Sequence, residues 1–205
     1  MIRAEIIIDF MNELHHFLQT RRSIRRFKPD PVPAPVIKRI LATAIFAPSA
    51  HNLQPWRFVH VESDLSKEKL GNALTEKMRT DMDAEGADPA QIQKRVEISI
   101  RRIDEAPVII LLCRDVTAIR KSEPEEEIMG IQSAALGGLQ LMLAAHAEGV
   151  GANWICWNLY AQAETRLALD LPKSWQAQAM IFLGYADEEP KKASRKSVDE
   201  LLTHR

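Results

Sequence analysis

The feature that most restricts the possible folds of this sequence is a segment at about 125–148 that is apolar on nearly every side of a helix. Its apolar residues recur in every turn, and they are Ile128, Ile131, Ala134, Leu136, Leu139, Leu141, Leu143 and Ala145. A helix that is apolar all round lies in a core or in an interface. Gly149-Val150-Gly151 follows and predicts the end of the helix, because glycine suits the left-handed conformation found there.

Other apolar and amphipathic segments predict the remaining elements. Short apolar runs predict strands, and they lie at 56–61, 106–113, 152–157 and 178–184. The first is expected to be central, and the second is apolar at nearly every position, which is typical of a strand buried on both faces. Helical spacing predicts helices at 5–20, 36–46, 66–104 (broken at Gly86 to Pro89) and 161–170. Residues 185–205 read as a polar tail with helical character near its end.

The order of these elements indicates the fold class. Helices and strands mix without regular alternation, which favours an α+β layer architecture over a doubly wound parallel sheet. We see no repeat and no linker, so residues 1–205 are expected to form a single domain.

Composition narrows the class of partner. The net charge is −1, so no overall field attracts nucleic acid or an anionic membrane. No hydrophobic run approaches the length of a membrane span, and the N-terminus does not resemble a signal peptide, which predicts a cytoplasmic protein. Cys113 and Cys156 both lie in apolar runs and are expected to be buried, reduced thiols. No metal-ligand spacing is present in the sequence.

Two polar segments are candidate binding elements. Arg21-Arg22-Ser23-Ile24-Arg25-Arg26-Phe27 places four guanidiniums and a hydroxyl close together, and guanidiniums hold phosphate oxygens through paired hydrogen bonds. Ile24 and Phe27 are expected to pack this segment onto the core. The alternative is a solvated basic turn or a nucleic-acid arm, which the net charge disfavours. The loop Ala47-Pro48-Ser49-Ala50-His51-Asn52-Leu53-Gln54-Pro55-Trp56 adds amide and hydroxyl groups, although such side chains can also simply cap their own turn.

These motifs, followed by the long apolar helix and Leu183-Gly184-Tyr185, resemble the flavin-dependent nitroreductase family from about Leu14 to Leu202. Within it, the helical region at 70–104 and the junction Asp104-Glu105-Ala106-Pro107-Val108 resemble the nitroreductase-like domain of coenzyme F420 γ-glutamyl ligases. The resemblance implies an α+β sandwich with a mixed or antiparallel sheet between helices. It also implies a homodimer with two sites at its interface.

The resemblance further implies which residues bind FMN. Those matched to the phosphate and ribityl end are Arg21, Arg22, Ser23, Arg25 and Arg195. The loop of Pro48, Ser49, Ala50 and Asn52 matches the segment that reaches the partner's flavin, and Gln132 matches the approach of the long helix to flavin and substrate. Gly151 to Ile155, including Trp154, match the strand beside the isoalloxazine ring. This chain has Trp154-Ile155-Cys156-Trp157 where many members carry Pro-x-Glu-Gly.

The function implied is an FMN-dependent oxidoreductase with NADH or NADPH as reductant and a small organic acceptor, such as a nitroaromatic compound or a quinone, in a ping-pong cycle. The flavin would supply the redox chemistry, so no side chain is expected to act as a nucleophile, and a backbone donor near 152–155 is the candidate for tuning the ring. The alternative is a flavin- or F420-binding protein with little NAD(P)H turnover.

Overall fold

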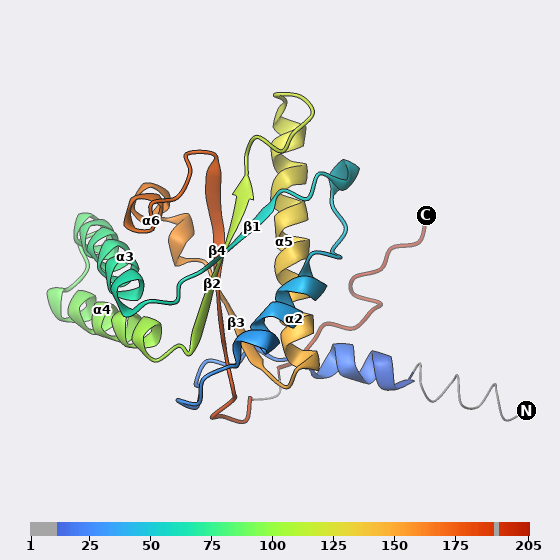
Figure 1. Ribbon diagram of the computed structural model, residues 1–205, viewed down its shortest axis with the longest axis horizontal. Coiled ribbons are helices and arrows are strands. Elements are labelled where there is room, and N and C mark those ends of the chain that lie inside the picture. The colour runs from blue at the N-terminus through green and yellow to red at the C-terminus, as the bar shows by residue number, and fades with distance from the viewer. Residues whose placement is uncertain (1–11, 191–192) are drawn as a thin grey trace, which may run out of the picture.

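The computed structural model describes residues 12–190 and 193–205 and has an α+β architecture with one antiparallel sheet (Figure 1). Its strands are β1 (Trp56–His60), β2 (Val108–Asp115), β3 (Gly151–Ile155) and β4 (Trp175–Gly184). They are ordered β1-β2-β4-β3, and each neighbouring pair is antiparallel. The expected sandwich is confirmed. The first part of the predicted helix at 5–20, up to residue 11, lies outside the described residues. Residues 12–20 are helical, as predicted.

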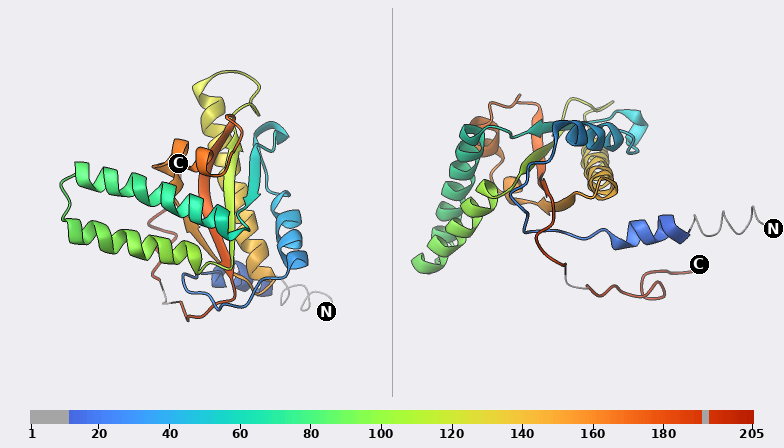
Figure 2. Two further views of the ribbon diagram at one scale, coloured as in Figure 1. Left: turned by 60° about the vertical axis from the view of Figure 1, so that its left-hand side comes forward. Right: turned by 60° about the horizontal axis from the view of Figure 1, so that its bottom comes forward.

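Helices cover both faces of the sheet (Figure 2). One face carries α2 (Ala34–Ala44) and α5 (Pro124–Ala147), and the other carries α3 (Asp64–Ala84), α4 (Pro89–Asp104) and α6 (Gln162–Ala168). Short 3₁₀ turns are η1 (Ala50–Asn52) and η2 (Trp157–Leu159). The predicted break between the two long helices is confirmed, because Asp88 caps α4 by accepting from the N–H of Gln91 and Pro89 occupies its first turn.

The position of β2 in the middle of the sheet accounts for its apolar sequence. In β2, Ile110 and Leu112 pack under α2 and α5, whereas Ile109 and Leu111 pack under α3 and α4. Successive side chains in a strand point to opposite faces, so a strand with helices on both sides must be apolar at every position. Buried Cys113 belongs to the same strand.

Three sequence expectations are wrong. The strand at 56–61 is not central: β1 stands at one end of the strand order. Trp56 is nevertheless buried, because α5 covers its ring at Gly137, so its apolar character reflects a covered face and not a central place. Cys156 is exposed, since it follows the last residue of β3. The described part of the tail has a turn at 198–201 but no helix, contrary to the helical character expected near its end.

The fourth correction concerns α5. This 24-residue helix is long and apolar enough to cross a membrane by length and composition alone, contrary to the expectation that no run approaches that length. Its glycines and small residues face the sheet, and 44% of its most apolar window is buried. Its other side exposes apolar residues, namely Ile128, Ile131, Leu136 and Leu139. The packing against the sheet is that of a core helix with a second apolar face.

Candidate functional site

The arginine segment, residues 21–27, lies along the end of the sheet beside β3. Ser23 forms a parallel bridge with Ala152, and the N–H of Ile24 donates to the carbonyl of Ala152 at 3.0 Å. The segment therefore extends the sheet for a short distance past β3. Its main chain is fixed by the edge strand, so its guanidiniums start from a rigid base.

Two apolar side chains fasten the segment, as the sequence predicted. Gly151 of β3 and Gly184 of β4 are partners in the strand register. A Cβ at Gly151 would lie 2.8 Å from Ile24 Cγ1, and a Cβ at Gly184 would lie 2.9 Å from Phe27 Cδ1. The two glycines thus leave the space that Ile24 and Phe27 fill.

The C-terminal tail, residues 185–190 and 193–205, lies against the same segment. The N–H of Lys28 donates to Tyr185 O at 2.9 Å, and the N–H of Asp187 donates to Arg26 O at 3.0 Å. A pocket of about 510 Å³ opens between the segment and the tail. We name it the arginine pocket; its lining is Arg21, Arg22, Ser23, Arg25, Arg26, Glu188, Glu189, Pro190, Ala193 and Arg195. The five phosphate-end residues implied by the resemblance therefore share one pocket.

The electrostatics of the arginine pocket favour an anion. Partial burial lowers the pKa of Arg21, and the nearby charges of Arg195 and Arg22 lower it further. Like charges held together are relieved when an anion binds between them. The carboxylate of Glu188 bonds to the main chain of the segment, and its pKa is lowered chiefly by the N–H of Arg25. Sequence reasoning missed Glu188.

The loop at 48–54 is built by an unusual backbone. His51, Asn52 and Gln54 all have positive φ, at 52°, 55° and 48°. Side chains stabilise this path: Ser49 Oγ accepts from the N–H of Gln54 at 3.0 Å, and Asn52 Oδ1 accepts from Gln54 Nε2 at 3.1 Å. Part of the polar character of the loop is thus used for its own turns, as the alternative interpretation held.

The loop at 48–54 and a groove beside Arg21 meet α5 at different places. Ser133 Oγ of α5 accepts from the N–H of Ala50 at 3.1 Å, whereas the groove beside Arg21 is lined by His146 near the other end of α5. The rise between Ser133 and His146 is about 20 Å along the helix. Exposed Gln132 lies beside the loop end. Within one chain, the predicted site residues therefore form two separate groups. One group is the five pocket residues, and the other is Pro48, Ser49, Ala50, Asn52 and Gln132.

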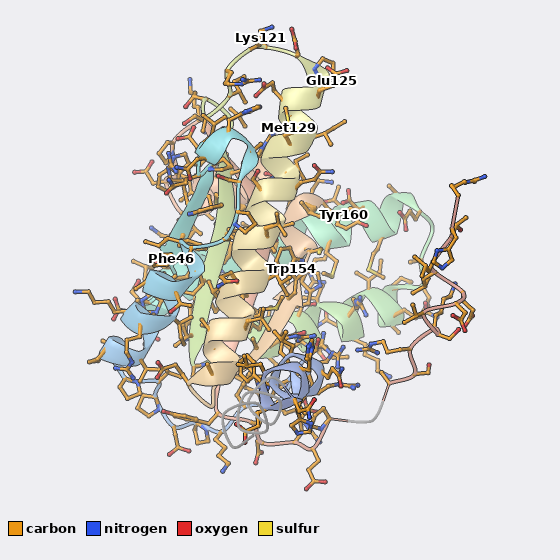
Figure 3. All side chains as sticks on the ribbon, turned by 90° about the vertical axis from the view of Figure 1, so that its right-hand side faces the viewer. Phe46, Lys121, Glu125, Met129, Trp154 and Tyr160 are labelled. Atoms are coloured by element: carbon orange, nitrogen blue, oxygen red, sulfur yellow. The ribbon has the colours of Figure 1, made fainter. Side chains whose placement is uncertain are left out.

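The strand β3 connects the arginine pocket to α5. Ile155 points into the core under α3, so its side chain is covered. Trp154 is half-buried and packs over Gly138 of α5, and its Nε1–H donates to Cys156 Sγ at 3.1 Å. Figure 3 shows Trp154 next to α5, on the side of the molecule that also carries Met129 of α5 and Phe46. An indole and an exposed thiol thus stand where the strand ends.

The two thiols are expected to differ in reactivity. Burial raises the pKa of Cys113 to about 12, whereas Cys156 is exposed. A thiolate-selective reagent should label one thiol per folded chain and two after unfolding. We expect Cys156→Ser to abolish labelling of the folded protein and Cys113→Ser to leave it unchanged. Labelling of both thiols before unfolding would contradict the burial of Cys113.

Known proteins are similar to this chain in sequence and in fold. A family model described as the nitroreductase family matches residues 18–185. YfhC of Bacillus subtilis, named as a candidate NAD(P)H nitroreductase, is 29% identical over 195 residues, which is 93% of each chain. A 5,6-dimethylbenzimidazole synthase of Rhodobacter capsulatus is 32% identical over 187 residues, 86% of each chain.

A solved structure gives the same result. A candidate nitroreductase of Desulfovibrio desulfuricans, crystallised with FMN, superposes with a TM-score of 0.72 at 27% identity. The superposition covers 93% of this chain and 95% of the other. The fold is therefore shared over nearly the whole length of both chains.

Proposed function

Because this chain belongs to the nitroreductase family, we propose that it is an FMN-dependent oxidoreductase that takes electrons from NADH or NADPH and passes them to a small organic acceptor. The acceptor class we propose is a nitroaromatic compound or a quinone, in a ping-pong cycle. The observation that carries the proposal is the arginine pocket, in which five guanidiniums from two distant parts of the sequence surround about 510 Å³.

The residues present fit FMN. Guanidiniums and a serine hydroxyl are the donor set that a phosphate needs, and the crowding that lowers the pKa of Arg21 is relieved by a bound dianion. Arg21, Arg22, Ser23, Arg25 and Arg195 would hold the phosphate and ribityl end. Bound FMN would supply the hydride and electron chemistry. The donor set thus suits the group that the family uses.

The main chain of β3 would orient the cofactor ring. This strand stands at one end of the strand order, and in the part of the chain described here its outer side carries the bridge to Ser23 at Ala152. The carbonyl of Ala152 points to this outer side, and main-chain groups alternate in direction along a strand, so the N–H of Trp154 would be the donor to a planar ligand at this edge. Trp154 would border the ring beside α5.

The first experiment is the visible absorption spectrum of the purified protein, with the released chromophore identified by mass. Release of FMN and bleaching by NADH or NADPH are expected. Uptake of F420 and not FMN would instead support the F420-binding alternative, although the relatives described above are named for NAD(P)H, FMN and 5,6-dimethylbenzimidazole. A protein that binds neither cofactor would contradict the assignment of the arginine pocket.

A second candidate activity comes from the relative in Rhodobacter capsulatus, which is named for the synthesis of 5,6-dimethylbenzimidazole. Its 32% identity over 187 residues is the observation that favours it. Analysis of the small molecules that the purified protein forms with FMN and NADH or NADPH separates the two activities. Formation of 5,6-dimethylbenzimidazole would assign the second one.

We propose that the working unit is a homodimer, with a small molecule as its other partner. The exposed face of α5 is apolar, and Phe46, which follows the neighbouring helix α2, is 80% exposed (Figure 3). Pairing of two copies through this face would cover these side chains. It would also bring the loop at 48–54 of one protomer toward the arginine pocket of the other. Within one chain, the loop and the pocket lie apart.

A charge on the α5 face is expected to separate the dimer. Leu139 lies near the middle of that face and is 43% exposed. We expect Leu139→Glu to give a monomer by light scattering, with loss of bound flavin. Leu167→Glu is the matched control, because Leu167 is exposed on α6 across the sheet. A dimeric Leu139→Glu protein with normal flavin content would contradict this interface.

We further propose that residues 1–205 form one FMN-binding domain, which the family match over 18–185 supports. A cytoplasmic location suits an activity that depends on NADH or NADPH, and cell fractionation tests it. Neither nucleic acid nor a membrane is proposed as a partner.

A further inference from the structure

Glu188 places a carboxylate in the arginine pocket, where an anionic cofactor is proposed to bind. Its Oε1 accepts from the main-chain N–H of Arg25 and, at 3.1 Å, from that of Arg26. Its Oε2 lies 3.5 Å from Arg26 Nε, and the side chain is only 17% exposed. The carboxylate is therefore bonded chiefly to the backbone of the arginine segment, and not spread over its guanidiniums.

These bonds complete a short antiparallel pairing between residues 25–28 and 185–188. The earlier contacts are Lys28 with Tyr185, the bridge of Phe27 with Ala186, and Asp187 with Arg26. Glu188 adds the last contact, with its side chain. Beyond it, the tail adds Arg195 to the pocket, close enough to lower the pKa of Arg21.

Arg195 depends on the tail for its position. Its Nη1 donates to Ser194 O at 2.9 Å, a contact inside the tail itself. Its place beside Arg21 therefore follows from where the tail main chain runs. A bond that fixes the tail to the arginine segment also fixes Arg195.

We propose that Glu188 is a positioning residue, which fastens the tail to the arginine segment and thereby holds Arg195 at the phosphate end of the cofactor. The proposal rests on the proposed function, because it takes the phosphate of FMN as the anion in this pocket. Glu188 acts through Arg195 and through the main chain, and it does not touch the reacting atoms.

The direction in which one substitution changes the affinity for a phosphate tests this role. By Coulomb's law alone, removal of a carboxylate from the arginine pocket strengthens the binding of a phosphate. If Glu188 fastens the tail, its removal weakens that binding instead. Glu189 lines the same pocket and is the matched control, since Glu189→Ala removes the same charge.

The measurement is the Kd of FMN for the flavin-free protein. We expect Glu188→Ala to raise it about tenfold, the effect of losing one charge-assisted hydrogen bond. Glu188→Gln should restore most of the affinity, because its amide oxygen still accepts from the main-chain N–H groups. Glu189→Ala should increase the affinity, the direction that Coulomb's law alone gives for removal of a carboxylate from this pocket. Tighter or unchanged binding by Glu188→Ala, or no rescue by glutamine, would overturn the proposal.

A double-mutant cycle tests the route through Arg195. If Glu188 acts by holding Arg195, the two losses should not multiply, and Glu188→Ala with Arg195→Ala should bind about as weakly as Arg195→Ala alone. Multiplied losses would show that Glu188 acts independently of Arg195 and would overturn this route.

A cofactor-free measurement separates failure of this inference from failure of the proposed function. Without flavin, trypsin should cut after Arg195 and Lys196 faster in Glu188→Ala than in the unchanged protein or in Glu189→Ala. Equal cleavage rates would overturn the fastening role even if FMN binds. An unchanged protein that does not bind FMN contradicts the proposed function, whereas the cleavage rates still decide whether Glu188 fastens the tail.

Discussion

Arg21→Ala is expected to weaken FMN binding by about 1.5–3 kcal/mol, or roughly 10- to 100-fold, because it removes charge-assisted hydrogen bonds to a phosphate. Arg21 is a half-buried residue of the arginine pocket, and Arg22 and Arg195 lie near enough to lower its pKa. Its interaction with a dianion is therefore less screened by water than that of an exposed arginine. Arg25→Ala should act in the same direction. Titration of the flavin-free protein with FMN gives both values.

Arg101→Ala is the matched control for these substitutions. Arg101 lies on α4, is 65% exposed and pairs only loosely with Glu105, at 4.0 Å. Such a surface pair contributes little, so flavin content should not change. Arg21→Lys should fall between the unchanged protein and Arg21→Ala, since lysine keeps the charge but lacks the planar fork. Unchanged flavin content in Arg21→Ala and in Arg25→Ala would remove the assignment of the phosphate end.

Side-chain pattern predicted the layers of this fold because burial acts on individual residues. The continuous apolar run of β2 follows from helices on both faces, and the all-round apolar character of α5 follows from a sheet on one side and an uncovered apolar face on the other. Trp56 shows where this reasoning stops. Its burial under α5 looks the same in the sequence as burial in a central strand, so the position of β1 in the strand order could not be predicted.

The candidate site was predictable to a different degree in its two parts. The arginine segment can be recognised from its composition, and its anchors Ile24 and Phe27 are apolar residues among charged ones. The role of the tail cannot be recognised in this way, because its contacts with residues 25–28 are mostly main-chain hydrogen bonds between segments some 160 residues apart. Main-chain pairing leaves no signature in residue type. Glu188 therefore reads as one of several acidic residues until its partners are seen.

Gly138→Ala is expected to lower the free energy of unfolding by about 1–3 kcal/mol, the usual cost of overpacking a filled site. A Cβ at this position would lie 2.3 Å from Trp154 Cζ3 and 2.9 Å from Leu112 Cδ2. Leu112 is fully buried in the middle of the sheet and has no room to retreat. Relief must come from Trp154, whose indole would have to swing away from α5 and break its contact with Cys156.

The opposing effect is the helix propensity of alanine, which favours the substitution by about 1 kcal/mol. Gly71→Ala isolates that effect, because Gly71 is a helical glycine of α3 whose Cβ would meet Ile103 Cδ1 at an ordinary 3.6 Å. Urea unfolding should therefore show Gly71→Ala as stable as the unchanged protein or more so, and Gly138→Ala as less stable. Since a displaced Trp154 would also enter the space assigned to the cofactor ring, Gly138→Ala should lose FMN affinity, whereas Gly71→Ala should not. Equal stability and equal affinity in both variants would mean that the indole is not held against α5.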